Sequence, residues 1–522
     1  MFFGSVNRRA ALGRLSLSAV LALAPRLASA QTQASKGDTA VTQAPPPAVP
    51  PPEAEPFSVD LLVERARGMA AAAYVKPSAP PSISGISYDD YFRIRFRADH
   101  DLWRDRKPEF RAEFFPPAWL YPRPLPINEV VAGLSRPVPF DPAMFDIPGE
   151  HADVAKSWGG FSGFRLLWPL NQADKLDEIA VFQGASYFRS LGRGQRYGLS
   201  ARGLAIGAGE PNEEFPDFTA FWLERPAIDD QAVVVHALMD SPSCSGVYSF
   251  TIQPGEDVVF DVTARIFPRT TMTKTGVAAM SSMFLFNVAD PSPVEDFRTA
   301  VHDSDGLAIW TGKGEHLWRP LQNPRAHRLS NFPDEDPKGF GLVQRARTLE
   351  DFGDLQARYD LRPSLWVEPL DGWGKGAVHL AELATTKETD DNIAIFWRPE
   401  APWQAGEAHV LRYRLYWGQE RFASPDARVF RTRTGADAQA GLRLFTVDLQ
   451  GGALAEGLDG VEVEVEADGG TVAWKDLSPY PLEASARAAF GVKPSASAVN
   501  LSLRLRRGET PISETWRYLW TP

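Results

Sequence analysis

The sequence predicts an all-β protein built from two β-sandwich domains. Short runs of alternating apolar and polar residues recur along most of the chain, and Gly, Pro, Asn and Asp separate them. This pattern is typical of antiparallel strands joined by turns. Regular strand–helix alternation is absent, as are the GxGxxG and GxxxxGK[ST] motifs, which argues against a nucleotide-binding α/β fold. A proline-bracketed hinge near residue 400 divides the predicted strands into a large N-terminal set and a small C-terminal set.

The large set is placed at residues 57–398 and opens with a helix. A short amphipathic helix is predicted at residues 57–73 because apolar residues recur there at helical spacing, namely Phe57, Leu61, Leu62, Ala66 and Met69. Period-two alternation then predicts many strands, for example at residues 91–96, 232–237, 258–266 and 377–383. We expect these strands to form one large β-sandwich.

The small set, at residues 399–522, follows a proline-bracketed hinge at residues 398–402. Seven short strands are predicted there, at residues 410–417, 428–433, 442–449, 461–466, 471–474, 500–506 and 515–520. Their number and spacing favour an immunoglobulin-like sandwich. The disulfide of true immunoglobulin domains is absent, because Cys244 is the single cysteine.

The first 30 residues have the features of a cleaved export signal. Arg8 and Arg9 precede an apolar run at residues 15–24, and Ala28-Ser29-Ala30 match the small-x-small pattern of a signal peptidase site. The run is about half as long as a bilayer-spanning helix requires, so we expect release into the periplasm. The paired arginines favour twin-arginine export. Residues 31–56 contain two proline triplets and are predicted to be an extended, disordered spacer.

Composition narrows the class of partner. The net charge of −11 argues against nucleic acid, because binding to phosphates needs a basic surface. The 15 Trp, 12 Tyr and 31 Phe residues are compatible with a neutral sugar, since aromatic faces stack on pyranose rings. Cys244 has no His–Asn or His–Asp partner pattern, so we expect a buried packing residue rather than a catalytic thiol.

Two acidic clusters are candidates for chemistry. They are the His-Asp-Ser-Asp-Gly run at residues 302–306 and the Glu-Thr-Asp-Asp-Asn run at residues 388–392. Two carboxylates from distant segments are what glycosidic bond cleavage needs, although Asp-rich turns more often only end strands. His302 stands outside any HxH or HxxxH grouping, so we predict an ordinary structural histidine, with no metal and no cofactor.

Four longer stretches carry a family resemblance. They are FQGASYFR at residues 182–189, VHDSDGLAIWTGKGEHLWRPLQN at 301–323, GFGLVQRARTLEDFGDLQARYDLRP at 339–363 and WGKG at 373–376. These stretches resemble the periplasmic glucan biosynthesis family, proteins G and D, and the similarity extends from Phe57 to the C-terminus. The twin-arginine signal is more similar to the D branch. The resemblance implies a galactose-mutarotase-like β-sandwich followed by an immunoglobulin-like domain.

The resemblance also implies an activity and its residues. It implies an anomer-inverting glycoside hydrolase or transglycosylase acting on linear β-1,2-glucan, with Asp391 as the general acid. The general base falls on Asp303, with Asp305 as second choice, and Tyr359 matches a position that relays a proton between acid and base. The matching stretches also contain candidate glucan contacts, namely Tyr187, Arg189, Trp318, Arg345 and Trp373, with Trp310 and Arg319 in the wider set. Glu388, from the second acidic cluster, is a further candidate contact.

Two alternatives stay open. A non-catalytic glucan-binding or assembly factor, working with a membrane glucan synthase, would carry the same cleft and differ only in having no turnover. A mutarotase-like epimerase would need a His/Glu pair in a cleft for one sugar, and no such pair is clear in the sequence. The expected partner is a β-1,2-glucan chain, and a homodimer is considered.

Overall fold

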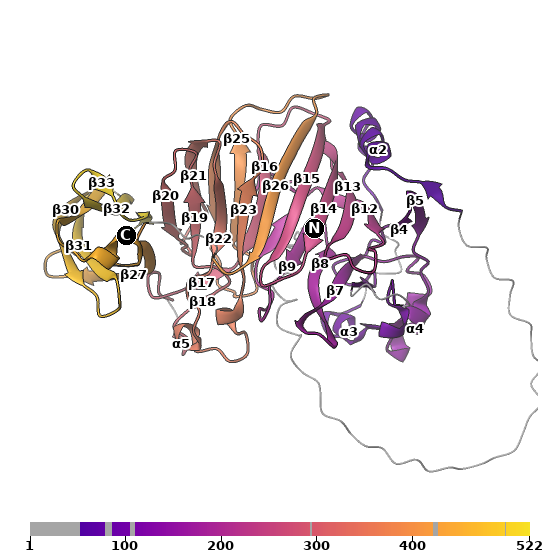
Figure 1. The fold of residues 1–522 in the computed structure, drawn as a ribbon, viewed down its shortest axis with the longest axis horizontal. Helices are drawn as coiled ribbons and strands as arrows, with labels where there is room; N and C mark the ends of the chain where they lie inside the picture. The colour runs from indigo at the N-terminus through magenta and orange to yellow at the C-terminus, as the bar shows by residue number, and fades with distance from the viewer. Residues whose placement is uncertain are drawn as a thin grey trace, which may run out of the picture.

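The computed structural model describes residues 53–78, 86–104, 110–292, 295–420, 426–495 and 497–521. These residues form an elongated, nearly all-β molecule (Figure 1). The predicted all-β class is confirmed. The export signal at residues 1–30 and nearly all of the predicted spacer lie outside the described residues.

The largest sheet contains 16 strands and runs through both halves of the chain. In sheet order its strands are Glu55–Pro56 (β1), Leu134–Pro137 (β5), Ile127–Val131 (β4), Asp217–Glu224 (β12), Val233–Asp240 (β13), Cys244–Gln253 (β14), Val258–Pro268 (β15), His409–Gly418 (β26), Ser364–Pro369 (β23), Gly339–Val343 (β22), Gly306–Trp310 (β19), His316–Pro320 (β20), Thr515–Trp520 (β34), Val499–Arg507 (β32) and Val461–Asp468 (β29), with Thr510–Pro511 (β33) paired to β32.

A ten-stranded sheet packs against it. In sheet order its strands are Arg328–Glu335 (β21), Lys375–Glu382 (β24), Ile393–Pro399 (β25), Thr275–Ser282 (β16), Ser200–Arg202 (β10), Tyr187–Ser190 (β9), Lys175–Gln183 (β8), Gly163–Gln172 (β7) and Arg111–Phe115 (β3), with Leu204–Ile206 (β11) paired to β16.

The remaining elements are short or belong to the C-terminal sandwich. A four-stranded sheet is formed by Arg428–Asp437 (β27), Leu442–Gln450 (β28), Ser485–Pro494 (β31) and Gly470–Pro479 (β30). Two small ribbons pair Phe284–Phe286 (β17) with Val301–His302 (β18), and Arg95–Phe96 (β2) with Phe145–Asp146 (β6). The α-helices are Val59–Ala71 (α2), Tyr88–Arg93 (α3), Ala152–Ala155 (α4) and Leu349–Phe352 (α5). The 3-10 turns are Ala98–His100 (η3), Pro142–Met144 (η4), Gly149–His151 (η5), Tyr359–Leu361 (η6) and Gly452–Glu456 (η7).

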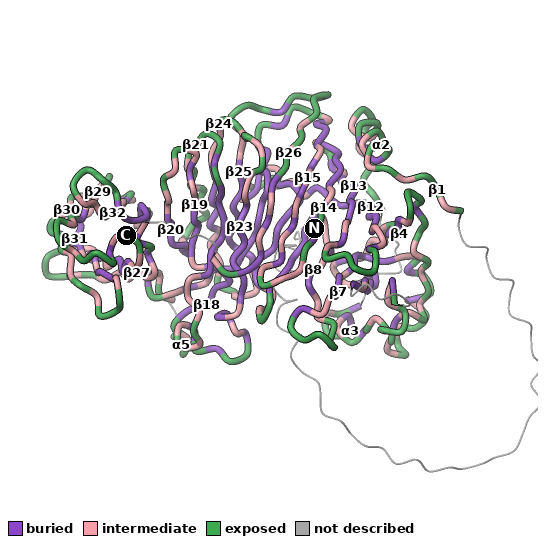
Figure 2. The backbone as a smooth tube through the Cα atoms, viewed as in Figure 1, coloured by how far each residue is buried: buried purple, intermediate pink, exposed green. Residues whose placement is uncertain are grey.

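Aromatic side chains fill the space between the two large sheets. The Phe188 ring of the ten-stranded sheet lies 5.0 Å from the Phe250 ring of the 16-stranded sheet, and Phe260 lies 4.9 Å from Trp417. The buried residues lie mainly along the central strands (Figure 2). Full burial of such rings provides the main driving force for folding, because each removes a large apolar area from water.

A second core lies inside the C-terminal sandwich. Phe445 and Phe490 of the four-stranded sheet pack against Trp516 and Tyr518 of β34. Trp318 from β20 joins the same cluster, and β20 pairs in parallel with β34. The C-terminal sandwich is therefore attached to the large domain by a continuous sheet as well as by side chains.

The predicted N-terminal helix is confirmed as α2, which is shorter at both ends. It begins after Ser58, whose hydroxyl accepts a hydrogen bond from Leu61 N and so satisfies one free amide of the first turn. Leu62 and Ala66 are buried against the large sheet, whereas Leu61 is 53% exposed. Within the described residues, no helix is both long and apolar enough to cross a bilayer.

The predicted strand at residues 91–96 is wrong for most of its length. Tyr88–Arg93 form helix α3, and only Arg95–Phe96 of this range form a strand. Ser87 caps the helix by accepting a hydrogen bond from Asp90 N, and its hydroxyl donates to the Asp90 carboxylate. This local capping outweighs the apolar alternation of the same residues.

Other strands differ from the expectation in place rather than in type. The predicted strand at 410–417 is found as β26, but it pairs with β15 and β23 in the middle of the 16-stranded sheet and not with the C-terminal strands. Strand β31 was not predicted, and it completes the four-stranded sheet. Residues Glu55–Pro56, predicted to belong to the spacer, pair with β5. Cys244 is fully buried, as expected.

Candidate functional site

Asp391 lies in the loop that leads into β25. The neighbouring Asn392 fixes this loop, because its Oδ1 accepts a hydrogen bond from Phe284 N at 2.8 Å and its Nδ2 donates to Phe284 O and Leu383 O at 2.9 and 3.1 Å. Asp391 is only 4% exposed. The backbone position of this carboxyl is thus set by an amide side chain that bridges two loops.

Arg189 reaches Asp391 from strand β9. The distance from Arg189 Nη2 to Asp391 Oδ2 is 3.9 Å, and both side chains are buried. Arg189 Nε donates a hydrogen bond to Ser200 Oγ at 2.6 Å, which orients the guanidinium. A buried carboxyl and a buried guanidinium therefore face each other on the ten-stranded sheet.

Asp303 is a second buried carboxyl in the same neighbourhood. It follows β18, its amide donates to Met283 O at 2.8 Å, and its Oδ1 lies 3.4 Å from Arg362 Nε. Burial raises the pKa of Asp303, while the charges of Arg362 and Arg189 oppose this rise. The charge of Arg189, whose guanidinium lies 3.9 Å from Asp391, therefore also opposes the rise in the pKa of Asp303.

Tyr359 begins the turn η6 beside Asp303. Its pKa is raised by burial and then by the negative charges of Asp303 and Glu388. Gln344 Nε2 donates hydrogen bonds to Tyr359 O and His302 O at 3.1 and 3.2 Å. One amide side chain therefore ties the backbone of the tyrosine to the segment that carries Asp303.

Glu388 belongs to the same group of charges. Arg298 Nη1 donates to Glu388 Oε2 at 2.7 Å and to Asp354 Oδ2 at 3.2 Å. About a third of the Glu388 side chain is exposed. The structure thus brings together five predicted residues, namely Asp391, Asp303 and Tyr359 from the catalytic set and Arg189 and Glu388 from the binding set.

A cavity of about 490 Å³ lies next to Arg189. Its lining combines aromatic rings with a few polar groups, including Tyr91, Phe92, Phe96, Phe114, Phe115, Tyr187, Tyr197, Arg165, Glu178 and Gln183. An apolar cleft with a few convergent polar groups is the usual form of a ligand site. Arg189 lines this cavity and also contacts Asp391, so it connects the cavity to that carboxyl.

Asp305, the second candidate base, is committed to backbone contacts. Its Oδ2 accepts hydrogen bonds from the amides of Arg345 and Ala346, both at 2.6 Å, and its Oδ1 lies 3.3 Å from His302 Nε2. His302 is buried between the Phe284 and Phe352 rings, and burial lowers its pKa. This arrangement favours Asp303 over Asp305 as the proton acceptor.

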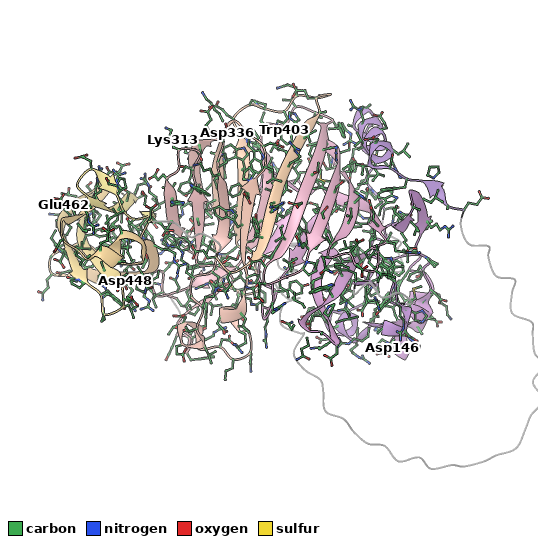
Figure 3. The ribbon with its side chains drawn as sticks, in the orientation of Figure 1. Asp146, Lys313, Asp336, Trp403, Asp448 and Glu462 are labelled. Carbon is green, nitrogen blue, oxygen red and sulfur yellow. The ribbon has the colours of Figure 1, made fainter. Side chains whose placement is uncertain are left out.

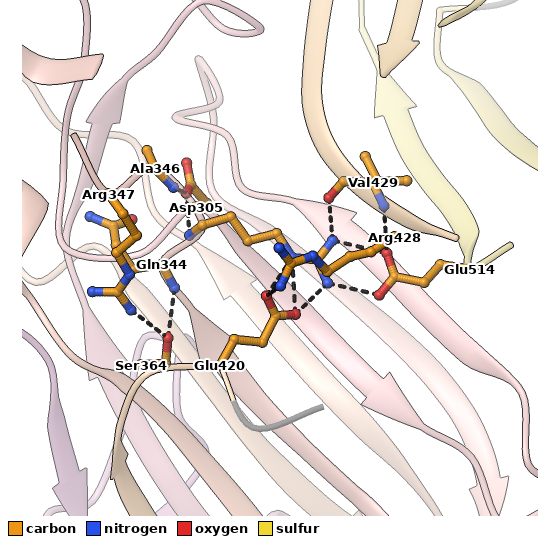
Figure 4. A network of polar contacts seen from close by, with 10 residues as sticks. Asp305, Gln344, Ala346, Arg347, Ser364, Glu420, Arg428, Val429 and Glu514 are labelled. Atoms are coloured by element: carbon orange, nitrogen blue, oxygen red, sulfur yellow. Dashed lines mark hydrogen bonds and ion pairs between the residues drawn. The ribbon is translucent and has the colours of Figure 1, made fainter. Parts of the chain in front are cut away.

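Arg345 and Trp318 lie at the junction with the C-terminal sandwich. The Arg345 guanidinium stands 3.6 Å above the Trp318 ring and pairs with Glu420 and Glu514 (Figure 4). Both side chains are almost completely buried. Arg319, from the wider set, is also buried, pairs with Glu382 and stands over the ring of Tyr518 in the C-terminal sandwich. These three residues are therefore placed to hold the two sandwiches together rather than to contact a glucan.

Trp373 lies near the opposite end of strand β24 from Asp391. It precedes β24, whereas Asp391 adjoins the far end of this strand, where Glu382 pairs with Ile393. The eight residues of β24 separate the two ends by roughly 23 Å at about 3.3 Å per residue. Asp336, which accepts a hydrogen bond from Gly374 N, lies at the upper edge of the view (Figure 3), far from β17 and β18.

Two arginines of the site were not singled out from the sequence. Arg362 was quoted inside a matching stretch without a role, and it forms the closest ion pair of Asp303. Arg298 stands outside all quoted stretches and holds Glu388. The sequence could have identified Arg362, because it lies in the RYDLRP run of a matching stretch. Arg298 could be identified only from its contacts in the structure.

Within the described residues, Asp90, Glu150 and His151 form a group that could in principle hold a metal ion. Arg93 Nη1 already donates to Asp90 Oδ1 at 3.1 Å and to Glu150 Oε1 at 2.9 Å. Because a cation occupies the centre of the group, the arrangement is that of an ion-pair cluster.

The chemistry that the candidate site can perform is proton transfer. The buried carboxyls of Asp391 and Asp303 can donate and accept protons, and the phenol of Tyr359 can relay them.

Comparison with known proteins places the chain in a family. The profile of the family described as "Periplasmic glucan biosynthesis protein, MdoG" matches residues 57–520. The chain is 44% identical over 472 residues to "Glucans biosynthesis protein G" of Rhodopseudomonas palustris strain CGA009, covering 89% of this chain and 94% of the relative. It is 41% identical over 545 residues to "Glucans biosynthesis protein D 1" of Ralstonia nicotianae, covering 99% of both chains.

The relatives carry both the G and the D designation at similar identity. The family is described as periplasmic, which agrees with the location predicted from the N-terminal signal. The match spans the large sandwich, the candidate site and the C-terminal sandwich together. This chain therefore belongs to the periplasmic glucan biosynthesis protein family.

Proposed function

We propose that this protein is an anomer-inverting glycoside hydrolase or transglycosylase that acts on linear β-1,2-glucan. The observation that carries the proposal is the pair of buried carboxyls, Asp391 and Asp303, which come from separate segments and face the buried guanidinium groups of Arg189 and Arg362, respectively. Cleavage of a glycosidic bond requires one carboxyl to protonate the leaving oxygen and another to activate the attacking water or hydroxyl. The relatives named for glucan biosynthesis support glucan as the substrate class.

In this proposal Asp391 is the general acid and Asp303 is the general base. Once ionised, a carboxylate whose pKa is raised by burial is a stronger proton acceptor than an exposed one. Tyr359, whose own pKa is raised partly by the charge of Asp303, relays the proton from the attacking group to that carboxylate. Arg189 orients Asp391 and limits the repulsion between the two carboxyls.

The cavity beside Arg189 provides the glucan site. Pyranose rings expose C–H faces that pack on aromatic rings, and their hydroxyls bond to charged and amide side chains. Tyr187 and Arg189 from β9 line this cavity, and Arg189 also contacts Asp391. A chain that occupies the cavity would thus extend toward Asp391.

The test is incubation of the purified mature protein with linear β-1,2-glucan, followed by mass spectrometry of the products. Hydrolysis gives shorter open chains, whereas ring closure gives products lighter by one water than open chains of equal length. Proton NMR of the first product identifies the anomer. Glucan binding without any product would instead indicate a non-catalytic binding or assembly factor and would refute the enzyme proposal.

A further inference from the structure

A buried ion cluster joins the C-terminal sandwich to the segment that follows β22. Arg345 Nη2 lies 2.6 Å from Glu420 Oε1 and 2.7 Å from Glu514 Oε1, and the Arg345 side chain is 3% exposed. Glu514 precedes β34 in the C-terminal sandwich and also accepts a hydrogen bond from Val429 N (Figure 4). The guanidinium is thus fully engaged and faces away from solvent.

The same segment also fixes the residues that flank the candidate base Asp303. The amides of Arg345 and Ala346 donate to Asp305, two residues after Asp303. The preceding residue, Gln344, donates to the carbonyls of His302 and Tyr359. Three consecutive residues therefore fix the position of both the Asp303 segment and Tyr359.

The opposite charges in the cluster stabilise one another. Burial alone would lower the pKa of Arg345, but the charges of Glu420 and Glu514 raise it above its usual value. Burial alone would likewise raise the pKa of Glu420, but Arg345 and Arg428 lower it. Arg345 and Glu420 therefore stabilise each other's charged forms, and loss of either side chain leaves a buried charge uncompensated.

We propose that Arg345 is a positioning residue through which the C-terminal sandwich holds the Asp303 segment and Tyr359 in place. The proposal rests on the proposed function for its effect on turnover, but its structural part stands independently. It assigns the C-terminal sandwich a role in the site although that sandwich contributes no residue to the cavity.

Two variants weaken the cluster, and a third serves as a matched control. Glu514→Gln keeps the shape of the side chain and removes its charge, and Arg345→Lys keeps the charge and removes the two-sided pairing. The control Arg487→Lys weakens a comparable pair, since Arg487 Nε donates to the buried Asp448 at 2.6 Å, inside the C-terminal sandwich. Circular dichroism and thermal melting confirm that each variant is folded.

The first measurement is amide hydrogen exchange, which needs no substrate. We expect the amides of Arg345 and Ala346, which bond to Asp305, to exchange at least tenfold faster in Glu514→Gln and Arg345→Lys, and at the wild-type rate in Arg487→Lys. Wild-type exchange at these amides in both folded cluster variants overturns the proposal, whether or not the protein is an enzyme.

The second measurement is the steady-state kinetics on linear β-1,2-glucan. We expect kcat to fall at least tenfold in the cluster variants with KM within about twofold of wild type, because positioning acts on the chemical step. A raised KM with unchanged kcat would instead make Arg345 a substrate contact and overturn the proposal. Absence of wild-type turnover would refute the proposed function alone, since the exchange measurement still decides the positioning role.

Discussion

Substitution of Asp391 by Asn gives the sharpest test of the proposed chemistry. The amide has the shape of the carboxyl but cannot donate a proton to the leaving oxygen as an acid does. Asn392 holds the loop through three hydrogen bonds to Phe284 and Leu383, so the backbone at residue 391 does not depend on the carboxyl. We therefore expect Asp391→Asn to fold normally and to lose turnover.

The expected loss of catalytic rate in Asp391→Asn is larger than the expected loss of folding stability, so the two effects can be measured separately. Loss of a general acid typically costs about 10²–10⁴ in rate, which corresponds to roughly 2.7–5.4 kcal/mol of transition-state free energy. For stability, the protonated carboxyl that the proposed role requires has no ion pair to lose, so the ionised form sets the upper limit: its pair with Arg189 at 3.9 Å has a gross attraction of about 4 kcal/mol at an effective dielectric constant of about 20. Burial of the carboxylate offsets most of this, so the free energy of unfolding should change by less than about 2 kcal/mol.

The assay is the initial rate of product formation from linear β-1,2-glucan, with Asp390→Asn as the matched control. Asp390 is the neighbouring carboxyl and accepts a hydrogen bond from Thr385 Oγ1 at 2.7 Å, outside the buried pair. An aryl glycoside of a short β-1,2-glucan should restore much of the rate to Asp391→Asn, because an aryl leaving group departs without protonation. The same substrate should not rescue Asp303→Asn.

Two results would refute this reasoning. One is a rate within threefold of wild type for folded Asp391→Asn on the natural glucan. The other is an equal loss in Asp390→Asn, which would show that the effect comes from the loop and not from the buried carboxyl.

Four further outcomes are expected. Tyr359→Phe should reduce turnover at least tenfold with an unchanged Kd for glucan, measured by calorimetry, because it removes only the hydroxyl that relays the proton; unchanged turnover contradicts the relay. Asn392→Ala should lower the free energy of unfolding by about 2–4 kcal/mol, at about 1 kcal/mol for each of its three hydrogen bonds, in denaturant titration; a loss below 1 kcal/mol contradicts the bridging role. The raised pKa of Asp303 means that the ionised base is lost as the pH falls, so the acidic limb of the kcat profile should lie above the ordinary Asp value of 3.8, and a limb at or below this value argues against Asp303. Burial raises the pKa of Cys244 to about 12, so a thiol reagent should label it only after denaturation, and rapid labelling of the native protein contradicts its burial.

The local sequence pattern was sufficient to predict the helices and strands whose formation depends on apolar periodicity and on capping. Helix α2 follows from its apolar spacing and its Ser58 cap, and strands such as β15 follow from period-two alternation, because burial of one face dictates these periods. Strand β31 has the same alternation, with Ala486, Ala488 and Phe490 buried. It was missed because alanine gives little contrast with its polar neighbours.

The tertiary structure alone decided which distant segments meet. The position of β26 in the large sheet depends on pairing with β15 and β23, which lie 141 and 40 residues before it, counted from the strands' last and first residues. Long-range pairing of this kind leaves no mark in the local pattern, because any alternating strand can pair with any other.

The same limit applies to the candidate site. The motifs identified Asp391, Asp303 and Tyr359 as chemically interesting, and the fold placed Asp391 against Arg189 and both Asp303 and Tyr359 against Arg362. The motifs could not distinguish these three residues from Arg345. A polar residue in a matching stretch can belong to the candidate site or to the contact between the two sandwiches. Only the partners decide: the guanidinium of Arg345 is enclosed by two carboxylates and an indole ring, which leaves no hydrogen-bonding edge for a sugar.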